Sequence, residues 1–318
     1  MFSFKARDPR PYHRRLSPPS YAATVGVCVL LAVSACSSPG GTSSTTSGAA
    51  TPSGSHAGAS ASAAGSYTLT APDDVKASGK LKICADIVYP PYTFMKNDKP
   101  TGIDVDFANA LATAMGVKVE WLQTGYVGIF GALQGGKCDA IINGINGEAD
   151  HDQVMAQIPY LQDTQGFLTK KGNPANIRTL DDVAGKSVAT QLGSTTAAYL
   201  QTLNKKFRQE GKAQMKIVTL PQDTAAFSAV LSGRVDAYFQ DGPVLGYYAN
   251  RYSDVEVLPL TVNPQTVVVG LRKNDTALVD VVTEGIRKMY ELGLMQQIAK
   301  TWGDPPANLL KDLPGPTS

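Results

Sequence analysis

The sequence predicts an α/β protein of two similar lobes that face each other across a cleft. Two stretches, 132–142 and 229–239, share one pattern: an apolar helix face ends at a glycine, then a basic residue and Asp-Ala lead into an apolar strand. The matching glycines, Gly136 and Gly233, stand 97 residues apart. Both strands run into polar segments, 143–146 and 240–242. Because ligands bind at strand ends in parallel α/β sheets, the two polar tips predict a binding cleft.

The first 35 residues are typical of a lipoprotein signal peptide. Five basic residues precede an uncharged, largely apolar run at about 21–33, which is shorter than the about 20 residues that a spanning helix needs. The segment Val33–Cys36 resembles a bacterial lipobox, and an ordinary secretory signal with a chance cysteine is the alternative. We therefore expect Cys36 to become the lipidated first residue of a protein held at the extracytoplasmic face of the cell membrane.

Residues 36–66 predict a flexible linker, because they are almost wholly Ser, Thr, Gly, Ala and Pro and offer no side chain large enough for a core. The folded part begins at residue 67, and none of its segments is apolar enough to cross a membrane. The whole chain has a net charge of +2, and loss of the five basic residues and one acidic residue in the first 35 leaves −2. We therefore expect no nucleic-acid partner.

Residues 67–172 predict the first part of lobe 1. Strands are expected at 81–85 and 117–121, and the helix between them has Asp104 as its N-cap and Gly116 at its end. A second helix carries the first copy of the repeat. Its apolar face is expected at Val127, Phe130 and Leu133.

Two cysteines belong to the folded part, Cys84 late in one strand and Cys138 just before another. In parallel pairing these positions would lie at different heights, which favours two buried thiols. A disulfide between them is the alternative, and the sequence leaves both open.

Residues 173–262 predict lobe 2, and residues 263–318 predict a return to lobe 1 with a C-terminal tail. The segment 173–176 is expected to cross between the lobes, and a helix capped by Ser194 or Thr195 lies between strands at 187–190 and 216–219. After a β-branched run at 265–271, a helix stripe is expected at Leu278, Val282, Ile286 and Met289. A chain that leaves a lobe and returns to it makes two crossings, which is the arrangement of a hinge.

The folded part offers few groups for catalysis. His151 is its one histidine, which excludes a multi-histidine metal site and leaves a single base for a Ser-His-Asp triad. The spacing of Gly125, Gly128 and Gly131 only weakly resembles a phosphate loop and indicates close packing on a helix face. The sequence therefore predicts a binding protein with no catalytic residue, metal or cofactor.

Six motifs in order, over about residues 81–303, resemble the family 3 solute-binding proteins of bacterial ABC importers. They are Tyr89–Tyr92, Gly102–Phe107, Ala132–Asp139, Gln191–Thr195, Gly233–Ala237 and Thr301–Gly303. The resemblance implies a two-lobed, type II periplasmic-binding-protein-like fold and a small amino-acid ligand. It also implies an ABC permease as the membrane partner, and a monomer.

The resemblance assigns the ligand's ammonium group to Asp241, for which an N-cap of the next helix is the alternative. Tyr89 and Tyr126 match aromatic walls around the aliphatic part of the ligand, with core packing as the alternative. Asp86 matches a position that contacts the ligand's side chain, which favours a cationic or amide-bearing ligand. A turn-capping role is the alternative for Asp86.

The resemblance assigns donors for the ligand's α-carboxylate to both lobes. One lobe offers a strand tip with Asn143, Gly144 and Asn146. The other offers Thr195, with Ser194 beside it, at a helix start where the dipole favours an anion. Two further positions match sites of side-chain specificity, Gln191 and Gln240.

His151 departs from the family, because it aligns with an arginine that clamps the ligand's carboxylate through two parallel hydrogen bonds. A histidine near its reference pKa of about 6.5 is mostly neutral at pH 7 and lacks the planar fork. Three ligand types follow: an amino acid bound weakly or with pH dependence, a ligand with a modified or missing carboxylate, or a quaternary amine held by Tyr89, Tyr126 and Tyr238. A solvent-facing position is the alternative for His151.

Three functions are compatible with these residues. The leading hypothesis is a lipid-anchored receptor that closes on a polar amino acid or related amine and delivers it to a permease. The alternatives are an enzyme similar to cyclohexadienyl dehydratases on the same fold, or a binder of quaternary amines or opine-like compounds. The missing arginine argues against the enzyme, so we expect no catalysis.

Overall fold

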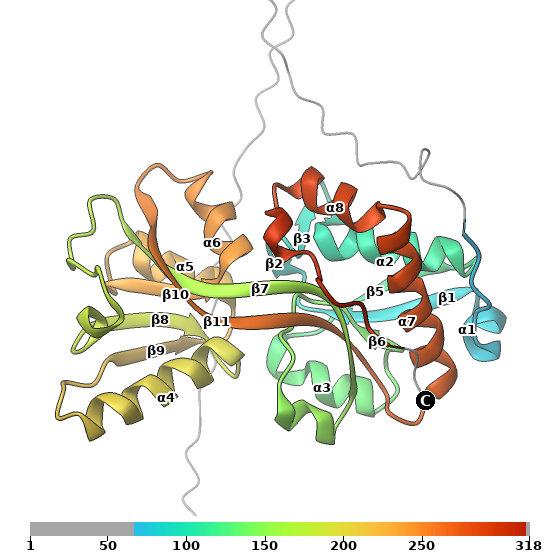
Figure 1. Ribbon diagram of the computed structural model, residues 1–318, viewed down its shortest axis with the longest axis horizontal. Coiled ribbons are helices and arrows are strands. Elements are labelled where there is room, and N and C mark those ends of the chain that lie inside the picture. The colour runs from blue at the N-terminus through green and yellow to red at the C-terminus, as the bar shows by residue number, and fades with distance from the viewer. Residues whose placement is uncertain (1–66, 316–318) are drawn as a thin grey trace, which may run out of the picture. The chain divides into compact units, whose positions relative to one another are not determined.

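The computed structural model describes residues 67–315. The expected signal peptide, the lipidated Cys36 and the linker of residues 36–66 lie outside this part of the chain. Within residues 67–315, no helix is both long and apolar enough to span a membrane. The strands and helices of this part form the two-lobed α/β architecture that the sequence predicts (Figure 1).

One eight-stranded sheet runs through both lobes in the order β5-β1-β6-β11-β7-β10-β8-β9. The long strands β7 (Ala156–Lys170) and β11 (Val255–Leu271) are antiparallel neighbours that pass from one lobe to the other (Figure 1). The first crossing is therefore made by β7. It does not lie at the predicted segment Asn173–Asn176, which forms a turn beyond the end of β7. The lobe limits at residues 172 and 262 stay a prediction.

Lobe 1 contains a parallel sheet sandwiched between helices. β1 (Lys80–Ala85) pairs in parallel with β5 (Lys118–Gln123) and β6 (Ala140–Ile141). Adjacent residues of β1 pack on opposite faces of this sheet. Ile83 belongs to the apolar cluster that includes residues of α2 and α7, and Cys84 belongs to the cluster that includes residues of α3. The remaining elements of this lobe are α1 (Asp73–Ser78), α2 (Ile103–Ala114), α3 (Tyr126–Gln134), η1 (Ala149–Gln153), α7 (Thr276–Glu291), α8 (Leu294–Trp302), η3 (Pro306–Asn308) and a small sheet of β2 (Val88–Tyr89), β3 (Thr93–Lys96) and β4 (Lys99–Thr101).

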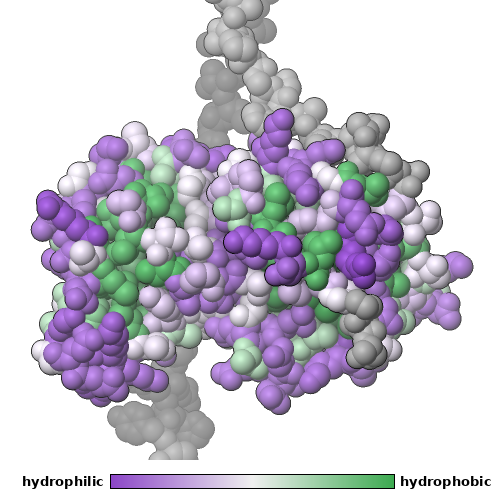
Figure 2. Space-filling model, viewed as in Figure 1, coloured by the Kyte–Doolittle hydropathy of each residue, from purple (hydrophilic) through white to green (hydrophobic). Residues whose placement is uncertain are grey.

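Lobe 2 repeats this layering. β8 (Ser187–Gln191) pairs in parallel with β9 (Lys216–Leu220) and β10 (Ala237–Asp241). Its helical elements are η2 (Leu180–Val183), α4 (Thr195–Gln209), α5 (Asp223–Leu231) and α6 (Gly242–Ala249). Ser194 is the N-cap of α4, and its hydroxyl oxygen accepts the Ala197 N–H at 3.2 Å, which confirms one of the two predicted caps. In the view of Figure 2, hydrophobic residues reach the surface on both lobes among a majority of polar residues.

The repeat seen in the sequence is a repeat in the structure. Gly136 and Gly233 both adopt positive φ, +69° and +72°, and turn the chain out of α3 and α5. The Asp139 carboxylate then accepts the backbone N–H of Lys82 at 2.9 Å, and Asp236 accepts that of Ser187 at 2.7 Å. Each aspartate thereby attaches the start of one strand to its parallel neighbour.

The predicted start of α2 is wrong. Its N-cap is Gly102, and the Asp104 carboxylate instead accepts the hydroxyls of Tyr160 at 2.5 Å and Thr93 at 2.9 Å. Gly102 has a φ of +138°, and a Cβ there would lie 1.9 Å from the Tyr92 carbonyl oxygen. Because this close approach starts the helix at glycine, Asp104 falls inside the first turn and faces the core.

The predicted face of α3 is confirmed in part. Leu133 is buried and Phe130 packs partly buried on the same apolar cluster, as predicted. Val127 is 65% exposed, so its place on the face is wrong, and Ile129 and Ala132 are buried instead. The interpretation of three glycines as close-packing positions is wrong as well, because a Cβ at 125, 128 or 131 would meet nothing within 4 Å. The helix therefore faces the core with Ile129, Ala132 and Leu133, and its glycines lie in open space.

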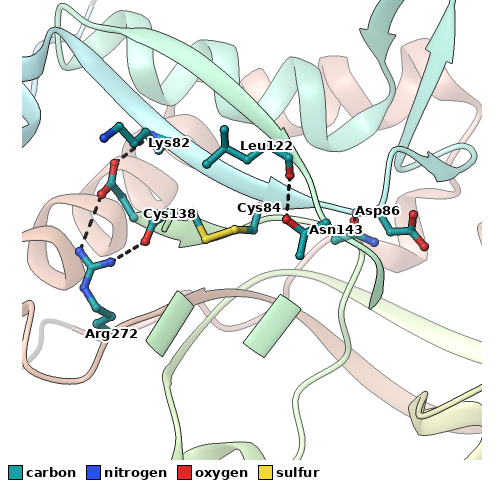
Figure 3. Close-up of a disulfide and its surroundings, with 9 residues drawn as sticks. Lys82, Cys84, Asp86, Leu122, Cys138, Asn143 and Arg272 are labelled. Atoms are coloured by element: carbon teal, nitrogen blue, oxygen red, sulfur yellow. Dashed lines mark hydrogen bonds and ion pairs between the residues drawn. A yellow bond between two sulfur atoms is a disulfide. The ribbon is translucent and has the colours of Figure 1, made fainter. Parts of the chain in front are cut away.

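Cys84 and Cys138 form a disulfide, so the expectation of two thiols is wrong (Figure 3). The chain bends at residues 137–139 and β6 begins only at Ala140. This bend brings Cys138 back beside β1, with 5.7 Å between the two Cα atoms. Different heights of the two cysteines in the sheet are expected only for an extended strand through Cys138. The chain bends there instead, and the bend brings the cysteines to the same height.

Candidate functional site

Polar side chains gather where the strands of the two lobes end. Asp86 directly follows β1, and Asn143 comes two residues after the end of β6, while β8 ends at Gln191 and β10 at Asp241. All four side chains are buried. Asp86 and Gln191 are equivalent positions of the two lobes. Ile83 pairs with Ala140 in lobe 1 and Val188 pairs with Ala237 in lobe 2, and Asp86 and Gln191 lie three residues after Ile83 and Val188. The ends of both parallel sheets therefore meet at one place, as the sequence predicts.

Asp241 is the centre of the hydrogen bonds between the lobes. Its Oδ2 accepts the Tyr89 hydroxyl at 2.6 Å, and its Oδ1 accepts the amide groups of Asn146 at 2.9 Å and Gln165 at 3.1 Å. Tyr89 and Asn146 belong to lobe 1, and Gln165 belongs to the crossing strand β7. Asp241 is the N-cap residue of α6, yet its side chain makes no capping bond. Its carboxylate is used between the lobes instead, and burial raises its pKa against the opposing effect of these three donors.

Thr195 joins the same cluster from the start of α4. Its Oγ1 lies 3.3 Å from the Asn146 amide nitrogen and 3.2 Å from that of Gln165, and accepts both. The neighbouring Ser194 hydroxyl donates to the Gln191 carbonyl at 2.7 Å while it caps α4. The structure thus places Thr195 in the same hydrogen-bonded cluster as Asp241, whereas the Ser194 hydroxyl is used to cap α4.

Asp86 forms a second carboxylate position near Tyr126. It accepts the side-chain amides of Gln123 at 3.0 Å and Gln191 at 3.5 Å, together with the backbone N–H of Tyr126 at the first position of α3. Burial raises the pKa of Asp86, and these donors oppose that shift. Burial and the charge of Asp241 raise the pKa of the Tyr126 phenol. Tyr126 therefore has Asp86 at its backbone and Asp241 within electrostatic reach of its ring.

Asn143 and Gly144 serve lobe 1 itself. The Asn143 amide oxygen accepts the backbone N–H of Asp86, which fixes the end of β1. Gly144 has a φ of +56°, and a Cβ there would lie 2.6 Å from the Tyr92 ring, so only glycine fits. Its backbone N–H donates to the Asp104 carboxylate.

The Gln240 side chain makes no hydrogen bond to the Asp241 carboxylate among the described residues. Its amide donates to Asp223 at 2.6 Å, and its amide oxygen accepts the backbone N–H of Asp241 at 3.0 Å. Tyr238 also donates to Asp223, at 2.5 Å, and its ring packs edge-on near Phe227. Burial raises the pKa of Asp223 to about 6.

His151 is not joined to the Asp241 cluster by any contact among the described residues. It lies in η1, with its ring 4.5 Å from that of Phe130 and its Nε2 3.7 Å from the Glu148 carboxylate. Its Nδ1 is buried without a hydrogen-bond partner. The ring therefore packs beside α3, and a role in holding a ligand's carboxylate stays a prediction.

Sequence reasoning missed three residues that the fold brings to the cluster: Tyr92, Asp163 and Gln165. The Tyr92 hydroxyl donates to Asp163 at 2.8 Å, and the Tyr92 ring stacks on Tyr89 with 5.6 Å between centroids. Burial and then the charge of Asp241 raise the pKa of Asp163 well above its usual range. The run 162–165 is polar within a long apolar strand, which was the available signal.

The buried charges of residues 67–315 are all of one kind. Every charged side chain that is buried in this range is an aspartate, and they number six: Asp86, Asp104, Asp163, Asp223, Asp241 and Asp304. In the same range, no group of three or more His, Cys, Asp or Glu side chains is arranged to hold a metal ion. Three of the six aspartates, Asp86, Asp163 and Asp241, lie where the lobes meet.

Comparison with known proteins agrees with this geometry. Residues 81–305 match the family model of bacterial extracellular solute-binding proteins, family 3. The L-cystine-binding protein TcyJ of Escherichia coli strain K12 is 27% identical over 231 residues, which make up 72% of this chain and 84% of that protein.

Two solved structures share the fold across the same region. An ancestral amino acid-binding protein described as a precursor of cyclohexadienyl dehydratase is 31% identical, with a TM-score of 0.67 over 72% of this chain and 98% of that chain. An ancestral arginine-binding protein with bound arginine is 30% identical, with a TM-score of 0.64 over 70% and 98%. These similarities confirm the predicted two-lobed fold.

Proposed function

The chain belongs to the bacterial extracellular solute-binding proteins of family 3, and on that premise we propose that it closes around an amine-bearing small molecule and delivers it to an ABC permease. The observation that carries the proposal is Asp241, a buried carboxylate whose hydrogen bonds join lobe 2 to lobe 1. A ligand ammonium group at Asp241 would offset the cost of burying this charge. Relatives named for cystine or arginine support a polar amino acid or a related amine as the ligand.

Closure would act through the two crossing strands. The ladder between β7 and β11 changes register at three places, and such irregularities locally disrupt strand pairing. A ligand that contacts Tyr89, Tyr126 and Asp86 in lobe 1 and Thr195 and Asp241 in lobe 2 has greater affinity for the closed state. This difference in affinity is what shifts the population toward closure.

The remaining site assignments and the anchor complete the proposal. Asn143, Gly144, Asn146, Ser194, Gln191 and Gln240 would line or support the site, and His151 would border it. A lipid on Cys36 would hold a monomeric receptor at the extracytoplasmic face of the membrane, with residues 36–66 as its linker and a permease as its partner.

A thermal-shift screen with parallel small-angle scattering tests the proposal. Amino acids, polyamines and betaines are added to the purified protein at pH 6 and pH 8, and a ligand should raise the melting temperature by mass action and reduce the radius of gyration. The same hit should fail with Asp241→Asn and persist with Asp106→Asn, whose carboxylate contacts Trp302 instead. Compaction with none of these compounds would refute the proposal.

An enzyme on the same fold is the second candidate, favoured by the similarity to the precursor of cyclohexadienyl dehydratase. Burial raises the pKa of Asp223 to about 6, which suits a proton donor near neutral pH. We propose no catalysis, because Asp223 is occupied by Tyr238 and Gln240. Incubation with prephenate or arogenate, followed by absorbance, separates the two functions.

A further inference from the structure

The seam between the lobes has an excess of hydrogen-bond acceptors and of negative charge. Asp86, Asp163 and Asp241 are buried there, and no lysine, arginine or histidine is buried anywhere in residues 67–315. The donors that reach Asp241 are a phenol and two amides, all neutral. A bound molecule must therefore supply positive charge that the described part of the protein lacks.

One unpartnered atom shows which kind of ligand group is missing. Asn146 is 2% exposed, and its amide oxygen has no hydrogen-bond partner. The orientation of this amide follows from chemistry, since its nitrogen faces the carboxylate of Asp241, which as an ion can only accept. The free position beside Asp241 is thus an acceptor, and an N–H donor of the ligand would satisfy it.

The same residues are poorly suited to a carboxylate. The amide nitrogens of Asn146 and Gln165 already donate to Asp241 and to Thr195, so neither is free for an anion. A ligand carboxylate would have to approach the Asp241 carboxylate without a buried cation to separate the charges. For a zwitterionic amino acid, the unfavourable interactions of the carboxylate therefore offset the binding free energy that the ammonium group contributes.

Two buried carboxylates lie near Tyr126, those of Asp86 and Asp241. Asp86 accepts its backbone N–H, while the charge of Asp241 acts on its ring hydroxyl. Gln191 of lobe 2 reaches Asp86, so both carboxylates lie where the lobes meet. An aliphatic chain across the aromatic ring could present one cationic group to each.

Resting on the proposed function, we propose that this cleft selects linear dications without a carboxylate, namely diamines and amino-guanidines, over the corresponding basic amino acids. The free acceptor of Asn146 and the absence of buried basic groups in residues 67–315 disfavour a ligand carboxylate, and Asp86 and Asp241 would each bind one cationic group.

Titration calorimetry with three matched ligand pairs tests this selectivity. Agmatine is compared with arginine, cadaverine with lysine and putrescine with ornithine, since each pair differs by one carboxylate. We expect each amine to bind at least tenfold more tightly than its amino acid. Equal or tighter binding of the amino acids overturns this inference and leaves the receptor function standing, whereas no binding of either kind overturns both.

Two variants then assign the cationic groups. Asp241→Asn should lower the affinity for every diamine at least tenfold, and Asp86→Asn should lower it for cadaverine but not for the monoamine pentylamine. Asp106→Asn, which removes a partly buried carboxylate bound to Trp302, is the matched control and should leave all affinities unchanged. Unfolding is separated from loss of binding by the melting temperature of each variant, measured without ligand. Loss of pentylamine binding in Asp86→Asn would refute the assignment of two cations.

Discussion

Lobes 1 and 2 use the same supersecondary unit but fix it by different chemistry. The registers of β1 with β6 and of β8 with β10 make Cys84 equivalent to Ala189, and the repeat makes Cys138 equivalent to Val235. The cysteines are joined by a disulfide, whereas Ala189 and Val235 are both buried in one apolar cluster. One topology thus tolerates a covalent or an apolar link at the same place.

This difference falls next to the site. Asp86 lies two residues after Cys84, and Tyr126 packs in the apolar cluster that contains both cysteines. Figure 3 shows the disulfide between β1 and the segment before β6, with Asp86 and Asn143 beyond it at the strand ends. The disulfide therefore restrains the lobe 1 side of the seam, while packing alone positions Gln191 and Asp241 in lobe 2.

Replacing the disulfide by the pair found in lobe 2 should have the largest effect. We expect Cys84→Ala with Cys138→Val to lower the free energy of unfolding by about 4 kcal/mol, from the chain entropy of a 54-residue loop. Chemical denaturation checks the value. A variant that loses less than about 1 kcal/mol would mean that packing alone already fixes lobe 1.

The reverse exchange in lobe 2 sharpens the comparison. Ala189→Cys with Val235→Cys should form a second disulfide, because these positions match the bonded pair of lobe 1. The gain should be about 2 kcal/mol, less than chain entropy alone gives, since engineered disulfides strain the native state. Mass spectrometry of non-reduced peptides detects the bond, and two persistent free thiols would contradict the equivalence of the lobes.

Each lobe also buries an aspartate whose pKa is raised by burial to about 6, Asp104 in lobe 1 and Asp223 in lobe 2. A folded-state pKa above the unfolded value means that the folded state keeps its proton between about pH 4 and pH 6 while the unfolded state loses it. Stability should therefore fall as the pH rises through this window and stay lower above it, by about 2 kcal/mol for each group. Denaturation at pH 4.5 and pH 7.5 measures this.

Single variants assign the pH effect to each lobe. Asp104→Asn and Asp223→Asn should each flatten part of the pH dependence, since amides do not titrate. A pH profile that neither variant changes would place the responsible groups elsewhere.

The matched aspartates of the repeat should give the smallest effects. Asp139→Asn and Asp236→Asn each weaken the bond to the start of the neighbouring strand, at about 1 kcal/mol. Hydrogen bonds from the Ser187 N–H and hydroxyl lower the pKa of Asp236 against the opposing effect of burial, so its contribution should be lost as the pH falls below about 4. Denaturant titration of both variants checks these values, and a variant that loses no stability would show that its bond does not stabilise the strand pair.

Local sequence patterns predicted much of the fold correctly. The stripe at Leu278, Val282, Ile286 and Met289 is buried in α7 as predicted, and the repeat correctly placed Gly136 and Gly233 at helix ends. These features depend on periodicity and on backbone conformations that glycine adopts without strain, and both are encoded within a few residues.

The wrong predictions depended on neighbours that are distant in the sequence. Val127 fits an apolar stripe, yet the side chains that α3 meets come from β1 and β6, and they select Ile129 and Ala132 instead. Asp104 looked like a helix cap because Tyr160, its partner 56 residues away, gives no local signal. The role of Asp163 in the site was not predicted for the same reason, since its partner Tyr92 lies 71 residues away.

By itself, the sequence determined the α/β class, the doubled unit and the polar strand ends, because periodicity, glycine positions and strand polarity are local properties. Only the tertiary structure decided that Cys84 meets Cys138 and that Asp241 receives Tyr89, Asn146 and Gln165. Those contacts join residues between 54 and 152 positions apart, and their geometry depends on a bend before β6 and on two strands that cross between the lobes. Side-chain burial and hydrogen bonding across such separations follow from packing, which no local pattern specifies.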